Sequence, residues 1–159
     1  MKKLLIISLL LLISCSKSDD LEDEREAYFL EAIIGSWSYD LVKVNGETFK
    51  VPHTEGCERD YFQFYNQEGK IFEFEESVVL NCSNCAKCAR SGTGLRWELK
   101  GNIIKMYFGE QFIVQYKILE VTETTFTYER ELDIDEDGTM EIAEITAIAY
   151  DPFNDFGSN

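Results

Sequence analysis

Proline, histidine and basic residues are scarce in this chain. It has two prolines and one histidine, and 15 basic residues stand against 30 acidic ones, which gives a formal net charge of −15. Phosphate backbones repel such a chain, so we expect no nucleic acid partner. The single histidine, His53, follows Pro52, and no nucleophile-elbow, phosphate-loop or zinc-protease motif accompanies it. We therefore expect that the protein is not an enzyme.

A hydrophobic run long enough to cross a bilayer is also missing. The apolar segment Leu4–Ile13 has ten residues, whereas a spanning helix needs about 20. Lys2 and Lys3 precede this segment and Cys15 follows it closely. A positive start, a short apolar stretch and a cleavage region predict a signal peptide over residues 1–14.

The end of this leader reads Leu12-Ile13-Ser14-Cys15 and resembles the lipobox of bacterial lipoproteins. The resemblance implies cleavage before Cys15, lipidation of its thiol and acylation of the new amino terminus. Several acyl chains anchor a protein stably to a membrane. We therefore expect a lipidated tether over 15–20 and an outer membrane lipoprotein of the cell envelope, on the periplasmic side or at the cell surface. The acidic stretch Ser16–Asp20 resembles a surface-export signal of Bacteroidetes lipoproteins, and a solvated tether is the alternative.

The first part of the mature chain has helical periodicity. It predicts a helix over 19–34, with Asp19 or Ser18 as the cap, Glu22 in a capping-box relation with Asp19 and Gly35 as the stop. The apolar stripe of this helix consists of Ala27, Leu30, Ile33 and Ile34.

From Ser36 onward, apolar and polar residues alternate, as in Trp37, Tyr39 and Leu41 with their polar neighbours. About eight such segments follow one another. Turn-forming pairs separate them: Asn45-Gly46, Glu68-Gly69, Gly101-Asn102, Gly109-Glu110 and Asp137-Gly138. The pattern predicts an all-β fold, an eight-stranded antiparallel up-and-down barrel behind a short N-terminal helix, over 21–151, with 152–159 as a flexible tail. A two-sheet sandwich is the alternative.

Gly35-Ser36-Trp37, placed after a helix and before the strands, resembles the Gly-x-Trp signature of lipocalins. Residues 92–99 (Gly-Thr-Gly-Leu-Arg-Trp-Glu-Leu) strengthen the resemblance to lipocalin-like lipoproteins of Bacteroidetes, although the last strand ends Ala149-Tyr150-Asp151 without the arginine that often covers the tryptophan. The resemblance implies a cup for a small apolar ligand, and we expect the protein to be a monomer. The expected ligand-binding residues are Trp37, Tyr39, Phe62, Phe64, Trp97 and Tyr116. A barrel of this size is only just wide enough for its own side chains, so a filled interior and a structural or interaction role form the alternative.

Four cysteines remain in the mature chain: Cys57, Cys82, Cys85 and Cys88. An even number in an exported domain predicts two disulfides. Cys57–Cys82 with Cys85–Cys88 is the preferred pairing, because Cys57 precedes one strand of a hairpin and Cys82 follows the other. A four-thiolate metal site and a redox-active Cys85–Cys88 pair are the alternatives.

Residues 133–144 read Asp-Ile-Asp-Glu-Asp-Gly-Thr-Met-Glu-Ile-Ala-Glu, which matches a calcium-loop pattern. The flanks resemble strands, so Glu144 lies too far along for calcium. A structural calcium site would use Asp133, Asp135, Asp137, the Thr139 carbonyl and Glu141. A polar hairpin tip is the alternative, and no other cofactor is expected.

Overall fold

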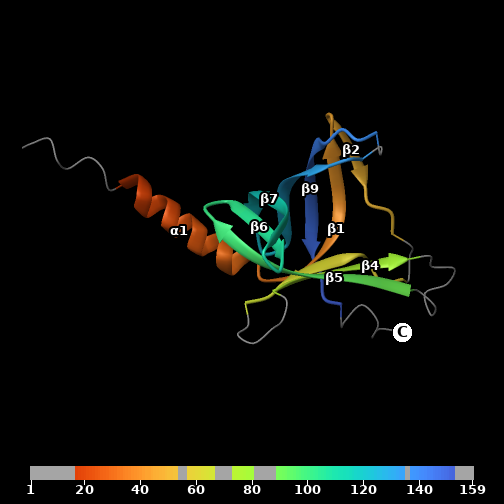
Figure 1. Ribbon diagram of the computed structural model, residues 1–159, viewed down its shortest axis with the longest axis horizontal. Helices are drawn as coiled ribbons and strands as arrows, with labels where there is room; N and C mark the ends of the chain where they lie inside the picture. The colour runs from red at the N-terminus through yellow and green to blue at the C-terminus, as the bar shows by residue number, and fades with distance from the viewer. Residues whose placement is uncertain (1–16, 54–56, 67–72, 81–88, 135–136, 153–159) are drawn as a thin grey trace, which may run out of the picture.

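The computed structural model describes residues 17–53, 57–66, 73–80, 89–134 and 137–152. Within these ranges the chain forms one helix and nine strands (Figure 1). Their bounds are α1 (Lys17–Ala32), β1 (Gly35–Val44), β2 (Glu47–Lys50), β3 (Tyr61–Phe64), β4 (Phe74–Leu80), β5 (Ala89–Lys100), β6 (Ile103–Phe108), β7 (Gln111–Val121), β8 (Thr125–Leu132) and β9 (Glu141–Ala149). No helical segment in these ranges has both the length and the apolarity needed to cross a membrane.

The strands close into an antiparallel barrel, as predicted. Each strand from β3 to β8 pairs with the strand that follows it in sequence. β1 pairs with both β3 and β9, which closes the sheet. Two strands share the same edge of β1: β3 pairs with Gly35–Ser38, and β2 pairs with Leu41–Val44. The barrel therefore has eight positions, and β2 extends β1 as a hairpin beyond β3. The sandwich alternative is excluded, because a sandwich leaves its sheets open.

The β1–β2 turn follows from the Asn45-Gly46 pair. Both residues have positive φ, 52° for Asn45 and 84° for Gly46. A two-residue hairpin turn of the type I′ class requires this conformation at both positions, and asparagine followed by glycine adopts it at the least cost. The pair therefore fixes the register in which Val44 lies opposite Glu47.

A β-bulge in β1 changes which residues face the interior. The register with β9 shifts between Tyr39 and Leu41, so Asp40 is the extra residue. An extra residue reverses the alternation of side chains beyond it. Val42, rather than Leu41, then packs against the core, and Val44 is buried. The predicted common face of Trp37, Tyr39 and Leu41 is therefore wrong at Leu41.

Helix α1 closes one end of the barrel with its last turns, and the rest of the helix projects away (Figure 1). Phe29 and Ile33 are buried in the core. The Tyr28 hydroxyl donates to the Val121 carbonyl at 2.8 Å. The predicted apolar stripe is wrong at Ala27 and Leu30, which are exposed, because the face of the last turns that contacts the barrel carries Phe29 and Ile33, four residues apart.

Aromatic side chains fill the barrel next to α1. The ring of Phe62 has no exposed surface. Its centroid lies 5.9 to 6.1 Å from those of four other buried rings, Phe64, Phe74, Phe126 and Tyr128. Aromatic pairs at these separations pack favourably in tilted and edge-to-face arrangements. This half of the interior is therefore a packed floor.

Candidate binding site at the end of the barrel opposite the helix

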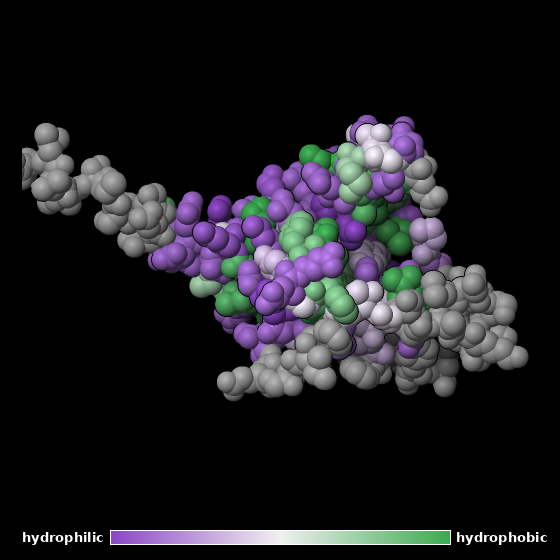
Figure 2. All heavy atoms as spheres, viewed as in Figure 1, coloured by the Kyte–Doolittle hydropathy of each residue, from purple (hydrophilic) through white to green (hydrophobic). Residues whose placement is uncertain are grey.

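The two ends of the barrel are built differently. Because β1 starts at α1 and neighbouring strands are antiparallel, the β1–β2, β6–β7 and β8–β9 turns lie at the end opposite the helix. We call this end the mouth. The hairpin of β1 and β2 rises there beside β9 (Figure 1). Figure 2 shows hydrophobic atoms at the surface where these strands meet the rest of the barrel.

The inward side chains of β8 change from apolar to charged along the strand. Alternate residues of a strand face the same side, and on β8 the inward ones are Phe126, Tyr128, Arg130 and Leu132. Phe126 and Tyr128 have no exposed surface. Arg130 comes next toward the mouth and is partly buried, followed by Leu132, which packs against the core. A cation therefore lies on an otherwise apolar column.

Arg130 lies against two stacked tyrosines. The rings of Tyr116 and Tyr128 are 4.5 Å apart with an interplanar angle of 22°. The Arg130 guanidinium carbon is 5.3 Å from the centre of the Tyr116 ring, which is a cation–π distance. Its Nη1 donates to the Tyr116 hydroxyl at 3.2 Å. The guanidinium is thus held in place by a ring face and a hydroxyl.

Across the interior, Tyr39 of β1 donates a hydrogen bond from its hydroxyl to Oε1 of Glu76 on β4. Glu76 lies between the inward positions of Phe74 and Val78 on the same strand. Its carboxylate is therefore directed at Tyr39. Among the described residues, no carboxylate lies within ion-pair distance of Arg130.

Burial keeps the three interior tyrosines protonated. It raises the pKa of Tyr116 to about 12 and the pKa values of Tyr39 and Tyr128 well above their ordinary range. The nearby Arg130 acts on Tyr116 and Tyr128 in the opposite direction, but burial has the larger effect. All three hydroxyls are therefore neutral hydrogen-bond donors at physiological pH.

Two polar atoms of this group have no hydrogen-bond partner within the described ranges. They are the hydroxyl oxygen of Tyr128 and Nε of Arg130, and both are buried. Buried polar atoms are nearly always hydrogen-bonded, and an unpaired one costs about 1–3 kcal/mol. We call Tyr39, Glu76, Tyr116, Tyr128 and Arg130 the mouth cluster. It has more donors than acceptors.

The structure divides the residues that we predicted to bind a ligand. Tyr39 and Tyr116 belong to the mouth cluster. The other four, Trp37, Phe62, Phe64 and Trp97, are buried in the packed floor. Their role in binding stays a prediction. Sequence reasoning missed Glu76, Tyr128 and Arg130, although the alternation Phe126-x-Tyr128-x-Arg130-x-Leu132 already places a charge on an apolar face.

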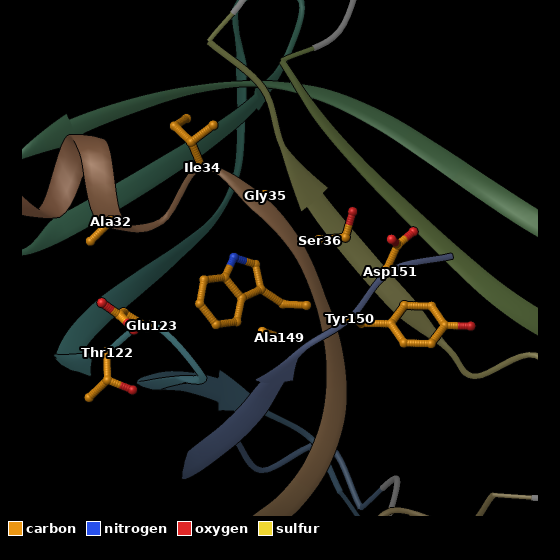
Figure 3. A pocket seen from close by; sticks show the side chains of 10 residues that line it. Ala32, Ile34, Gly35, Ser36, Thr122, Glu123, Ala149, Tyr150 and Asp151 are labelled. Atoms are coloured by element: carbon orange, nitrogen blue, oxygen red, sulfur yellow. The ribbon is translucent and has the colours of Figure 1, made fainter. Parts of the chain in front are cut away.

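A surface pocket of about 420 Å³ lies at the opposite end, beside α1. Figure 3 shows Ala32 and Ile34 from the helix end, Thr122 and Glu123 from the β7–β8 turn, and Tyr150 and Asp151 after β9 around it. Trp37 also lines it, and its indole nitrogen donates to the Ile33 carbonyl at 2.8 Å. The indole nitrogen is therefore engaged at the junction of helix and barrel. We place the candidate site at the mouth, because the buried polar atoms of Tyr128 and Arg130 lie on that side.

In the acidic turn between β8 and β9, the carboxylates accept hydrogen bonds from backbone amides of the turn itself. Asp133 accepts from the Gly138 amide at 3.0 Å, and Asp137 accepts from the Thr139 amide at 2.7 Å. Glu141 accepts from the Ile134 amide at 3.3 Å. Asp135 lies outside the described residues. Among the described residues, including those of this turn, no three histidine, cysteine, aspartate or glutamate side chains form a group that could hold a metal ion. The calcium site stays a prediction.

Cys57 is buried and disulfide-bonded. This bond removes Cys57 from a four-thiolate metal site. Cys82, Cys85, Cys88 and Cys15 lie outside the described residues, so the disulfide pairing and the lipidation stay predictions.

No family model, curated protein or solved structure matches the chain. The class of this protein is therefore defined by its geometry. It is a closed antiparallel barrel with a helix at one end, an aromatic floor, and a cluster of tyrosines with one arginine and one glutamate at the mouth.

Proposed function

We propose that the protein is a lipid-anchored binding protein of the cell envelope that takes a small amphipathic molecule into the mouth of its barrel. The observation that carries the proposal is a pair of buried polar atoms, on Tyr128 and Arg130, that have no hydrogen-bond partner in the part of the chain that the structure describes. A ligand that supplies acceptors to these atoms removes their desolvation cost on binding. Binding sites commonly contain groups that lower the stability of the free protein in this way, because function requires them there.

The packed floor limits the size of this ligand. Because Phe62, Phe64 and Phe74 have almost no exposed surface, a molecule that enters the barrel stops at the level of the tyrosines. The floor also favours the second candidate function, a structural or interaction protein with a solid barrel. Under that alternative the mouth cluster only holds strands together.

Native mass spectrometry of the full chain, isolated from its own host and released from lipid nanodiscs, separates the two candidates. We expect a retained organic molecule of a few hundred daltons that is lost on denaturation. A chain that carries only its covalent lipid, and that binds no amphipathic probe, would support the solid barrel instead.

The anchor is tested separately. Cys15→Ala should leave the leader uncleaved and abolish labelling by a fatty-acid probe, because the thiol is the predicted acceptor of the lipid. Ser16→Ala is the matched control and should be labelled as the unaltered chain is. Labelling that survives Cys15→Ala contradicts the anchor without touching the binding proposal.

A further inference from the structure

We infer that the ligand carries a single carboxylate, which lies between Arg130 and the hydroxyls of Tyr116 and Tyr128, with its apolar part directed toward the mouth. This inference rests on the proposed function and specifies the class of ligand.

The first step concerns charge. The guanidinium of Arg130 is partly buried, and no carboxylate of the described chain lies within ion-pair distance of it. Glu76, on the facing wall, is near enough for its charge to act on Arg130, but its hydrogen bond is to Tyr39 and it makes no ion pair with the guanidinium. Buried charges in proteins are paired, because an unpaired charge is poorly solvated in the interior. An anion from outside the chain supplies the missing partner.

The second step concerns hydrogen bonds. Nε of Arg130 and the hydroxyl of Tyr128 have no partner among the described residues. The Tyr116 hydroxyl already accepts from Arg130 Nη1, so its own hydrogen is directed elsewhere. These groups all need an acceptor. A carboxylate has two oxygens and accepts several hydrogen bonds, and it pairs well with the planar guanidinium.

The third step concerns the direction of the ligand. Leu132 follows Arg130 on the same column, closer to the mouth, and Val42 and Val114 are apolar wall residues that pack against the core. The exposed side chains of Phe108, Ile134 and Met140 lie at or beside the turns of this end. The carboxylate therefore lies deepest, above the tyrosine rings, and an apolar chain or ring extends outward.

The fourth step concerns the number of charges. The chain has a net charge of −15, and Glu76 lies inside the site. This field disfavours multiply charged anions such as phosphate esters more than a monoanion. One guanidinium compensates one negative charge. The geometry thus favours an organic monocarboxylate.

The experiment compares octanoate, 1-octanol and octyl phosphate by isothermal titration calorimetry. The full chain is held in nanodiscs of zwitterionic lipid, and empty nanodiscs are subtracted. We expect octanoate to bind at least about tenfold more tightly than either competitor, since a charge-assisted hydrogen-bonded pair contributes about this factor or more. Arg130→Met should reduce octanoate binding by about tenfold or more and leave octanol unchanged, and Arg130→Lys should restore part of it. Lys105→Met removes the same charge from an exposed side chain of β6 and should have no effect.

The melting temperature of each variant is measured as well, so that a loss of binding can be distinguished from a loss of folding. Because no carboxylate of the described residues pairs with Arg130, removal of its poorly solvated charge should offset the loss of its contacts with Tyr116, so Arg130→Met should melt at about the same temperature as the unaltered chain or higher. Tighter binding of octyl phosphate, or octanoate binding that Arg130→Met does not change, overturns the carboxylate inference while the proposed function stands. If neither octanoate nor octanol binds the unaltered chain, the proposed function fails as well.

Discussion

The hydroxyl of Tyr39 donates a hydrogen bond to the carboxylate of Glu76, and this bond joins two strands that do not pair with each other. Both strands pair with β3, whose first residue Tyr61 lies opposite Ser38 and Ser77. In the described part of the chain, β3 begins at Tyr61, and no strand lies between β1 and β4 on the side of Tyr61 toward the mouth. The side-chain bond therefore bridges the barrel wall where β3 begins, and it occupies one oxygen of the Glu76 carboxylate.

Tyr39→Phe is expected to lower the free energy of unfolding by about 1 kcal/mol, because it leaves a partly buried carboxylate without its donor. Glu76→Gln should cost less, since an amide oxygen still accepts from Tyr39. Urea unfolding of both variants and of the double variant measures the coupling. Tyr65→Phe is the matched control, because Tyr65 donates to Glu75 on the exposed side of the sheet at 2.9 Å. Equal losses in Tyr39→Phe and Tyr65→Phe would contradict the bridging role.

Stability should fall in strongly alkaline solution. Burial raises the pKa of Tyr116 to about 12 and those of Tyr39 and Tyr128 well above 10. In the unfolded chain these tyrosines titrate near 10. The folded state therefore binds more protons between these values, and the free energy of unfolding decreases as pH rises from about 10 through 12.

Urea unfolding at several pH values, with tyrosinate absorbance recorded in parallel, measures this dependence. The interior tyrosines should ionise only together with unfolding. Tyr116→Phe should make the decline with pH shallower. A tyrosinate signal for all tyrosines that precedes unfolding would show that the interior is accessible to hydroxide.

The barrel could be predicted from sequence because its strands alternate cleanly and its turns carry the right residues. On β8, for example, Phe126 and Tyr128 are inward and buried, as their spacing predicts. Asn45-Gly46 forms the expected turn with both φ values positive. Closure then follows, since eight antiparallel strands in sequence order leave two edges that can pair.

Three features could not be predicted from the sequence: the bulge in β1, the buried face of α1 and the mouth cluster. None of them follows from the regular spacing of apolar residues. The bulge at Asp40 reverses the facing of later residues in β1, and no local composition marks it. In α1 the pattern suggested Leu30 for the buried face, but the barrel contacts the neighbouring face of the last turns, which carries Phe29 and Ile33. The mouth cluster joins Glu76 and Arg130 from distant strands, and such a meeting depends on the shape of the closed sheet.

Phe62→Ala should be among the most destabilising substitutions, at about 3–5 kcal/mol, because it opens a cavity among four other buried rings. Phe49→Ala on β2 is the matched control, since that ring is 51% exposed, and its loss should be small. Calorimetry or urea unfolding compares the two. A loss below about 1 kcal/mol for Phe62→Ala would mean that the floor is loosely packed, with room for a ligand deeper than the tyrosines.

Asp133 should stabilise the β8–β9 turn through its hydrogen bond from the Gly138 amide at 3.0 Å. Gly138 has a φ of 88°, a conformation that glycine adopts readily. Asp133→Ala, measured by urea unfolding in a chelator, is therefore expected to lower the free energy of unfolding by about 1 kcal/mol. Glu131→Ala, an exposed acid at the end of β8, is the control for the loss of one negative charge.

The same variants test the predicted calcium site. A carboxylate has two oxygens, so the contact of Asp133 Oδ2 with the Gly138 amide leaves the other for a cation. If the turn binds calcium, roughly millimolar calcium should raise the melting temperature more than equal magnesium, which demands a stricter octahedron and keeps its waters. Asp133→Ala and Asp135→Asn should both abolish that rise, whereas Glu131→Ala should keep it. Equal responses to calcium, magnesium and matched sodium chloride would mean that the carboxylates serve only the backbone of the turn and that the salts merely screen their repulsion.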